Sequence, residues 1–592
     1  MDQNDYHDQY VGKTGDEKTE GSSLEKGTQE LAVQDDRAYQ FDPADLDQVQ
    51  RKLKQRHVQM IAVRIHVFAA AHDLSSCSAD RWYTGTGLFL GSGAALREGG
   101  PLGALIGYAL VGTVGYATLC SLGEMTAFAP ISGSFPHYAS RWADPALGFA
   151  LGWNYFYTSA ISTPVEISAA VVLLTFWDAD TGHAAAYTAA ITVGVCAINI
   201  FGVRWFGEAE FCFSIIRVLF LITLLIITGL VVDLGGGPSH DRVGFRYWDN
   251  PGNIGFDRLL ALISVIVQAA FSFQGMELVA IAASETQSPR RNIAKAVRRV
   301  FWRILVFYIL GILITGMLVP YNDPDLLQSS GTAAESPYVI AFTRAGIKVL
   351  PAFINACVFT SAFSAGNSFL FSASRILYGL AIRGQAPRIL GYCTKNGLPI
   401  AAILVSGAFA WLSFMNVSSG AETVFNWFVN LSTTAGFFSW GAICVTYLRF
   451  YKGLKVQGID RTKFSYYSGL QPYLAWWAIC WLAFFILING YAVFWVWNTD
   501  SFITAYINIP IFVVLFVFWK VFKRTRAWRP DEMDFVTAIP TLEETEIPEV
   551  PATTFFGKIG APSSEHPFLA DPQPSLPPAF RTSHTHILTV RY

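Results

Sequence analysis

Long apolar stretches, separated by short polar connections, run along most of the chain. A helix needs about 20 mostly apolar residues to cross the hydrocarbon core of a bilayer. Eleven stretches reach about this length, and a shorter one at 84–97 precedes them as the remnant of a further crossing. The pattern therefore predicts an all-α polytopic membrane protein with twelve transmembrane helices. The eleven full stretches lie at 102–127, 146–177, 185–203, 209–232, 257–282, 300–320, 338–373, 399–417, 422–448, 472–497 and 502–522.

The charges between these stretches alternate in sign along the chain. Lys and Arg gather after the stretches 257–282, 338–373, 422–448 and 502–522, whereas the intervening connections are acidic or neutral. Because short cytoplasmic loops are enriched in Lys and Arg, the basic loops are predicted to be cytoplasmic. Both termini are then cytoplasmic as well, which requires an even number of crossings.

Composition narrows the class of protein further. Of the 592 residues, 52% are hydrophobic and only 15% are charged, whereas soluble domains carry about 25% charged residues. This excludes a soluble multidomain protein, and the formal net charge of −2 gives no basis for nucleic-acid binding. The eight cysteines are scattered without a Cys-x-x-Cys spacing, which indicates small apolar residues in helices. Met1–Asp47 is polar and acidic without the apolar core of a signal peptide, and we expect a free cytoplasmic tail.

Among the ionisable residues inside the apolar stretches four stand out, because a charge there is costly and usually functional. They are Glu124, Glu166, Arg217 and Glu277. Glu124 lies near a cytoplasmic helix end, and a carboxylate that caps the helix or anchors a loop is the favoured interpretation there. Glu166 follows a proline deep in its stretch, and functional and structural roles are equally open. For Glu277 we favour a functional role.

Glycine residues in two segments of the chain, one beside Glu277 and one at the front, point to a binding site at broken helices. In Phe271–Glu277, Gly275 can end the helix and free backbone carbonyl groups, which face cations in transporter sites. Gly85 and Gly87 flank Thr86 at the front of the chain and allow backbone N–H groups to approach a carboxylate. Together the two segments describe a site for a zwitterion, with amides for the carboxylate and carbonyls with Glu277 for the ammonium group.

Several motifs, in order along residues 50–550, resemble those of the fungal amino-acid permeases. These form the yeast amino-acid transporter family of the amino acid–polyamine–organocation (APC) superfamily. The resemblance implies twelve helices in which the first five and the next five form inverted repeats, with helices one and six broken at the site. It also implies proton-coupled uptake of amino acids across the plasma membrane by alternating access. The motifs are Lys52–Ala62, Gly85–Gly93, Gly123–Met125, Ile131–Phe135, Phe271–Glu277, Ser364–Asn367 and Ser374–Leu380.

The resemblance assigns roles to individual residues. Glu166 matches a third-helix glutamate that helps with substrate or proton, and Asn367 falls in an eighth-helix motif where a helix–helix hydrogen bond is an equally good account. With Glu124 and Arg217 they are the candidates for proton coupling or gating. The residues that match the carboxylate-binding turn are Gly85, Thr86 and Gly87, and those that match the sixth-helix substrate segment are Phe271, Ser272, Phe273, Gly275 and Glu277.

Two departures from the family pattern affect these expectations. The family usually has lysine at position 217, and Arg217 keeps the charge but stays protonated. Val63–Tyr83 interrupts the first helix with several ionisable groups, which disfavour membrane insertion. We interpret this segment as translated intron sequence in the gene model, and the unfamiliar sequence after Val550 supports that interpretation. The alternative is a real variant that is defective in transport because its first helix is disrupted.

The resulting organisation has a disordered tail (1–50), a transporter core (51–525) that contains the atypical insertion (63–83), and a C-terminal tail (526–592). We expect no enzyme activity, no cofactor and no metal, because no catalytic or metal-binding motif is found. Expected partners are the amino acid, protons, the bilayer and ubiquitin-ligase machinery acting on Lys13, Lys18 and Lys26, with no nucleic acid. A non-transporting amino-acid sensor is the alternative function, and a channel fits paired helix breaks less well.

Overall fold

The computed structural model describes residues 91–131, 134–178, 180–200, 242–248, 256–278, 289–327, 337–344, 346, 350–394, 397–419, 421–495, 497–537 and 539–540. These residues form helices joined by turns and loops, and no strand occurs among them. The predicted turn Gly85–Gly87, the insertion 63–83 and the stretch 209–232 with Arg217 lie outside the described residues, as does the N-terminal tail.

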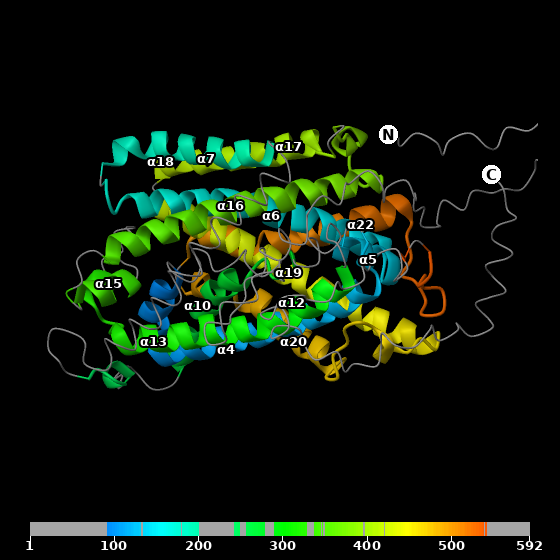
Figure 1. The fold of residues 1–592 in the computed structure, drawn as a ribbon, viewed down its shortest axis with the longest axis horizontal. Coiled ribbons are helices and arrows are strands. Elements are labelled where there is room, and N and C mark those ends of the chain that lie inside the picture. Colours follow the sequence, from blue (N-terminus) through cyan, green and yellow to red (C-terminus); the bar gives the residue numbers. More distant parts are fainter. Residues whose placement is uncertain are drawn as a thin grey trace, which may run out of the picture. The chain divides into compact units, whose positions relative to one another are not determined.

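The longer helices occupy the predicted apolar stretches (Figure 1). Short helical segments extend or connect them, among them a π-helical segment, Ile304–Ile309, which joins α12 to α13. In chain order the α-helices are α4 (Gly91–Phe128), α5 (Ser134–Trp142), α6 (Pro145–Leu174), α7 (Ala184–Ile200), α10 (Phe256–Phe273), α12 (Pro289–Arg303), α13 (Leu310–Leu318), α14 (Pro324–Leu327), α15 (Pro337–Arg344), α16 (Leu350–Ile382), α17 (Ile400–Ala410), α18 (Asn416–Ser419), α19 (Ala421–Val456), α20 (Tyr473–Ile488), α21 (Thr499–Tyr506) and α22 (Asn508–Lys523).

Helix α4 consists of two helical parts that meet at a kink. Gly100 has φ 66° and ψ 176°, a conformation that only glycine adopts without strain, and Pro101 begins the second part. The kink separates the apolar remnant predicted at 84–97 from the stretch predicted at 102–127. The two therefore follow one another directly rather than across a longer loop.

The stretch 338–373, predicted as one span, is divided in the structure. Its first part is the short helix α15, and its second part begins α16, which continues to Ile382. Gly346 between them has φ 75°, and Pro351 lies in the first turn of α16, where proline is favoured. The boundary prediction was wrong here because the apolar composition runs through this break.

Helix α6 lies at the core of the bundle, while α21 and α22 lie at its periphery. The most apolar window of α6 is 89% buried, against 17% for Thr499–Lys523. α6 packs against α16, α19, α5, α22 and α17. Its N-terminus is set by Asp144, whose side chain accepts a hydrogen bond from Ala146 N at 2.8 Å, and by Pro145 in the first turn.

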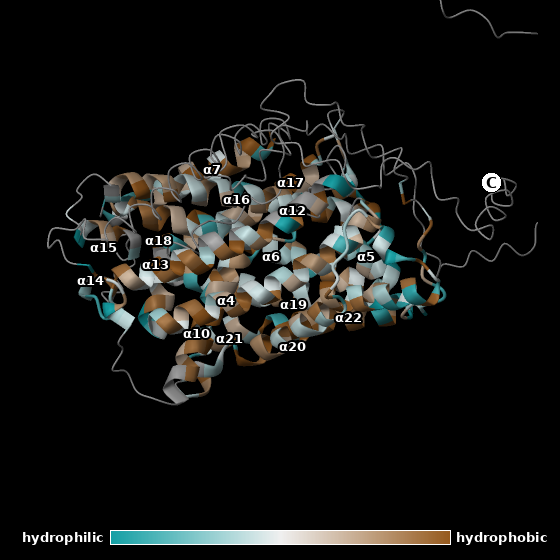
Figure 2. Cartoon of the chain, turned by 60° about the horizontal axis from the view of Figure 1, so that its bottom comes forward, coloured by the Kyte–Doolittle hydropathy of each residue, from teal (hydrophilic) through white to brown (hydrophobic). Residues whose placement is uncertain are grey.

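The distribution of hydropathy is that of a membrane protein. In Figure 2 the helices are mostly brown to white along their lengths, with hydrophilic residues near α14 and near α5. Within the described residues, four helical segments are long and apolar enough to cross a bilayer: Gly91–Phe128, Pro145–Leu174, Val424–Val456 and Thr499–Lys523. Shorter apolar helices accompany them. The total of twelve crossings and the inverted repeat stay predictions.

A segment that we call the C-terminal strap, residues 525–537 and 539–540, runs back over the end of the bundle after α22. Arg141 of α5 donates to Asp534 O at 2.8 Å and pairs with the Asp534 carboxylate at 3.0 Å. Arg290 of α12 donates to Pro540 O at 2.6 Å. Burial raises the pKa of Asp534, but Arg141 and nearby backbone amides outweigh it, so the pKa lies below its ordinary value. The strap thus connects α5 to α12.

Candidate functional site

Helix α10 ends at Phe273, and the chain then turns through residues 274–277. Gly275 has φ 86°, a left-handed conformation that favours glycine and takes the backbone out of the helix. The Leu278 amide donates to Gly275 O at 3.0 Å, which closes the turn. The helix end that the sequence predicts near Gly275 is therefore present.

Glu277 is buried within this turn, with 3% of its surface exposed. Its Oε2 accepts a hydrogen bond from Trp440 Nε1 of α19 at 3.0 Å, and its Oε1 accepts one from Gly275 N at 3.3 Å. In both of these bonds the donor is an N–H group, so the carboxyl group is held as an acceptor. Trp440 was not predicted, because a tryptophan in an apolar stretch gives no signal of a polar contact.

Ser272 and Phe273 face α4 and the π-helical segment Ile304–Ile309. Ser272 Oγ lies 3.1 Å from the Tyr108 hydroxyl of α4, and Ser272 O accepts from the Tyr308 hydroxyl at 2.9 Å. Phe273 is fully buried and stacks on Tyr308 with a centroid distance of 4.3 Å. Both side chains, predicted to bind substrate, make helix–helix contacts in this structure.

Phe271 lies in the last turn of α10 and belongs to an apolar cluster. It packs edge-on against Phe425 of α19 with a centroid distance of 6.2 Å. Val165 of α6 and Phe428 of α19 complete the contact. Phe271 therefore joins α10 to both α6 and α19 beside the turn.

Glu166 lies on α6 where this helix approaches α16. Its side chain is buried, with 4% exposed. A Cβ atom on Gly366 of α16 would lie 3.4 Å from Glu166 Cβ, so the two backbones approach closely. The structure thus places Glu166 at a helix–helix contact and leaves both interpretations of its role open.

Asn367 forms a hydrogen bond between two helices. Asn199 Nδ2 of α7 donates to Asn367 Oδ1 at 2.6 Å and to Asn367 O at 3.2 Å. Both residues are buried. The contact supports the helix–helix alternative for Asn367.

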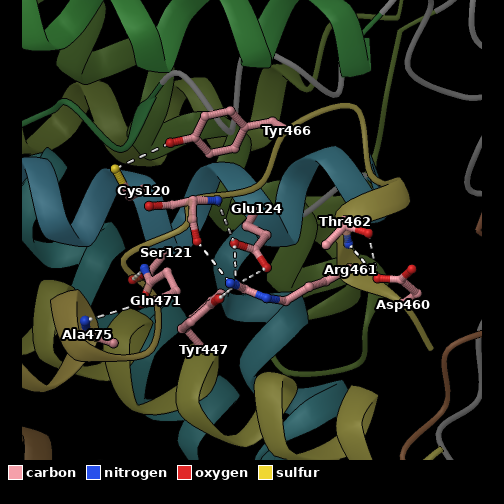
Figure 3. Close-up of polar contacts among 11 residues, drawn as sticks. Cys120, Ser121, Glu124, Tyr447, Asp460, Arg461, Thr462, Tyr466, Gln471 and Ala475 are labelled. Carbon is pink, nitrogen blue, oxygen red and sulfur yellow. Dashed lines mark hydrogen bonds and ion pairs between the residues drawn. The ribbon is translucent and has the colours of Figure 1, made fainter. Parts of the chain in front are cut away.

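Glu124 anchors a loop at the end of α4, as Figure 3 shows. The carboxylate is completely buried, and Arg461 Nη1 lies 3.0 Å from Oε1 and 3.2 Å from Oε2. The same Nη1 donates to the Tyr447 hydroxyl of α19 at 3.1 Å, and Ser468 N donates to Glu124 Oε2 at 3.3 Å. Glu124 therefore holds the α19–α20 loop against α4, which is the alternative that the sequence favours. Arg461 was counted only as a basic loop residue, because its partner is 337 positions away.

A small polar cluster follows the C-terminal end of α6. Asp178 Oδ2 lies 2.7 Å from His183 Nδ1 and accepts from the Tyr187 hydroxyl at 2.6 Å. The Tyr187 hydroxyl, the Asp180 amide and the His183 ring lower the pKa of Asp178 to about 2. The hydrogen bond and the charge of Asp178 raise the pKa of His183. Across the described residues, no group of three His, Cys, Asp or Glu side chains is arranged to hold a metal.

Comparison with known proteins identifies the family of the chain. The model of the family described as amino acid permease matches residues 83–531. The chain belongs to the amino acid permease family. The match begins at Tyr83, where the atypical segment 63–83 ends.

Named relatives cover most of the chain. The dicarboxylic amino acid permease of Saccharomyces cerevisiae is 38% identical, covering 83% of this chain and 80% of the relative. The proline-specific permease of the same yeast is 39% identical, covering 87% and 84%. The general amino-acid permease GAP1 of Saccharomyces cerevisiae is 38% identical, covering 80% of this chain and 77% of the relative. The family and these relatives are transporters rather than enzymes.

Proposed function

We propose that this protein imports amino acids across the plasma membrane by proton symport with alternating access. The observation that carries the proposal is the helix end at Gly275 beside the buried Glu277, in a chain that belongs to the amino acid permease family. A helix end in a membrane interior frees backbone groups that need partners. An amino acid supplies them, because its ammonium group donates hydrogen bonds and its carboxylate accepts them.

The substrate site in this proposal has two halves. The turn 274–277, whose backbone leaves the helix at Gly275, receives the ammonium group through its carbonyl groups and Glu277. Gly85, Thr86 and Gly87 receive the carboxylate through backbone amides. The relatives carry names that range from dicarboxylic to proline and general permeases, so the family alone does not select the side chain.

The sequence candidates for proton coupling include Glu166 and Arg217, and we add Glu277, a predicted substrate residue, because N–H donors hold its buried carboxyl group. A carboxyl group held by N–H donors can gain a proton without losing its place, and protonation changes its interaction with an ammonium group. Arg217 acts as a fixed cation because it does not titrate. Arg217→Lys should therefore alter the pH dependence of uptake more than the affinity, and identical pH profiles would contradict this role.

Uptake by permease-deficient yeast that expresses the chain tests the proposal. We expect saturable uptake of a labelled amino acid, faster at acidic external pH and accompanied by proton entry. A competition panel of all twenty amino acids then defines the substrate class. Glu277→Gln should abolish the proton entry, whereas Glu532→Gln, in an exposed ion pair of the strap, should transport normally. A correctly localised protein that transports none of the twenty amino acids would contradict the proposal and favour a sensor or a transport-defective variant.

The orientation of the chain follows from the basic loops. Both termini are proposed to be cytoplasmic, with Lys13, Lys18 and Lys26 accessible to ubiquitin ligases. Epitope tags at either end should be protected from external protease in intact cells. Cleavage of either tag would contradict this orientation.

A further inference from the structure

Gln274, the first residue of the turn, is bound to Ser432 of α19 by a reciprocal pair of hydrogen bonds. Its Nε2 donates to Ser432 O at 2.7 Å, and its Oε1 accepts from Ser432 Oγ at 2.9 Å. The side chain is 3% exposed. A glutamine amide bound through both its donor and its acceptor has one orientation, because a flip would place like groups against each other.

Three residues of α19 form the surface that receives the turn. Ser432, Gly436 and Trp440 are spaced four residues apart and so lie along one face of the helix. Ser432 binds Gln274, Trp440 binds Glu277, and Gly436 between them leaves the space that Gln274 fills. A Cβ atom on Gly436 would lie 2.3 Å from Gln274 Nε2, which is too close for any side-chain contact.

The same contact extends to α6. Ser162 Oγ lies 2.6 Å from Ser432 Oγ, and all three residues of the chain Ser162–Ser432–Gln274 are buried. Ser162 Oγ also donates to Thr158 O at 2.8 Å, so the two serine hydroxyls distribute two protons over three contacts. The start of the turn is therefore tied to two helices at once.

We propose that Gln274 is a positioning residue for substrate binding. By holding residues 274–277 against α19, it fixes the direction of the backbone groups that the turn offers and keeps Glu277 opposite Trp440. The inference rests on the proposed role of the turn as the substrate site. A glutamine that serves only to pack two helices would affect folding but not affinity.

Two single variants disturb the contact between Gln274 and α19 in different ways. Gln274→Ala removes the side chain, and Gly436→Ala keeps it but pushes it out of place. Each should raise the KM for uptake about tenfold, which corresponds to about 1.4 kcal/mol, with Vmax per surface transporter changed much less. The double variant Gln274→Ala with Gly436→Ala should be no worse than Gln274→Ala alone, because the clash of the new methyl group needs the glutamine.

Gly441→Ala is the matched control, since Gly441 lies on α19 and a Cβ there would meet nothing within 4 Å. It should leave KM and surface amount unchanged. If the two single variants lower only the surface amount or Vmax at an unchanged KM, or if their effects add fully in the double variant, the positioning role is wrong while the transport function stands. If the wild-type protein transports no amino acid, the proposed function itself fails.

Discussion

The ion pair between Glu124 and Arg461 gives a quantitative test of how the α19–α20 loop is held against α4. Arg461→Ala leaves the Glu124 carboxylate completely buried without its counter-charge. Breaking a buried ion pair costs about 3–5 kcal/mol. We expect the lower limit, about 3 kcal/mol, because the Arg461 side chain is 19% exposed and water can partly replace it.

Thermal unfolding of the purified transporter measures this effect. A loss of this size should lower the unfolding temperature by about 2–3 °C in a chain of 592 residues. Glu124→Gln combined with Arg461→Ala should recover part of the loss, because no charge is then left buried. Arg526→Ala is the control, since Arg526 and Glu532 form an ion pair whose side chains are 65% and 29% exposed, and such pairs contribute little.

Two results would refute the reasoning. Unfolding of Arg461→Ala at the wild-type temperature would mean that the buried carboxylate does not depend on the guanidinium group. A double variant less stable than Arg461→Ala would mean that Glu124 stabilises α4 through its other hydrogen bonds rather than through the charge pair.

Three further changes test other contacts. Phe535→Ala removes a buried ring that anchors the strap, and limited proteolysis should then cut the strap before the helices; unchanged resistance would contradict its docking. Asn199→Ala removes the bond to Asn367 and should cost about 1–3 kcal/mol of stability at an unchanged KM, whereas a changed KM would favour a transport role. His183→Gln should increase hydrogen exchange in the loop after α6 between about pH 4 and 6.5, where Asp178 is ionised and His183 is protonated. The stabilisation of the loop by His183 is lost as the pH rises through the raised pKa of His183, and the stabilisation by Asp178 is lost as the pH falls through about 2. A difference in hydrogen exchange between variant and wild type that occurs only at alkaline pH would contradict the pair.

The sequence predicts the features that depend on local composition. Apolar length locates the helices, and the conformational freedom of Gly275 locates the end of α10 within a few residues. Polar residues in an apolar stretch also indicate contacts, as Glu124 and Asn367 show. These predictions need no knowledge of which helices are neighbours.

Features that depend on the pairing of distant residues could not be predicted in the same way. Arg461, Trp440 and Gln274 all find partners more than a hundred positions away. Nothing in a single sequence distinguishes Arg461 from the other basic residues of its loop. Gln274 differs from its neighbours in the motif only because Gly436 leaves a space of the right size for it.

The turn after α10 is bound on two sides by different kinds of contact. Ser272 and Phe273 attach it to α4 and to the π-helical segment, whereas Gln274 and Glu277 attach it to α19. A movement of α10 away from α19 would therefore break the bonds of Gln274 and Glu277 and leave those of Ser272 in place. Polar groups that separate inside a membrane must find new partners, since each unsatisfied group costs several kcal/mol. In the proposed transport cycle an ammonium group or a proton at Glu277 would supply such a partner for the carboxylate, so an occupied site would lower the cost of separating Glu277 from Trp440.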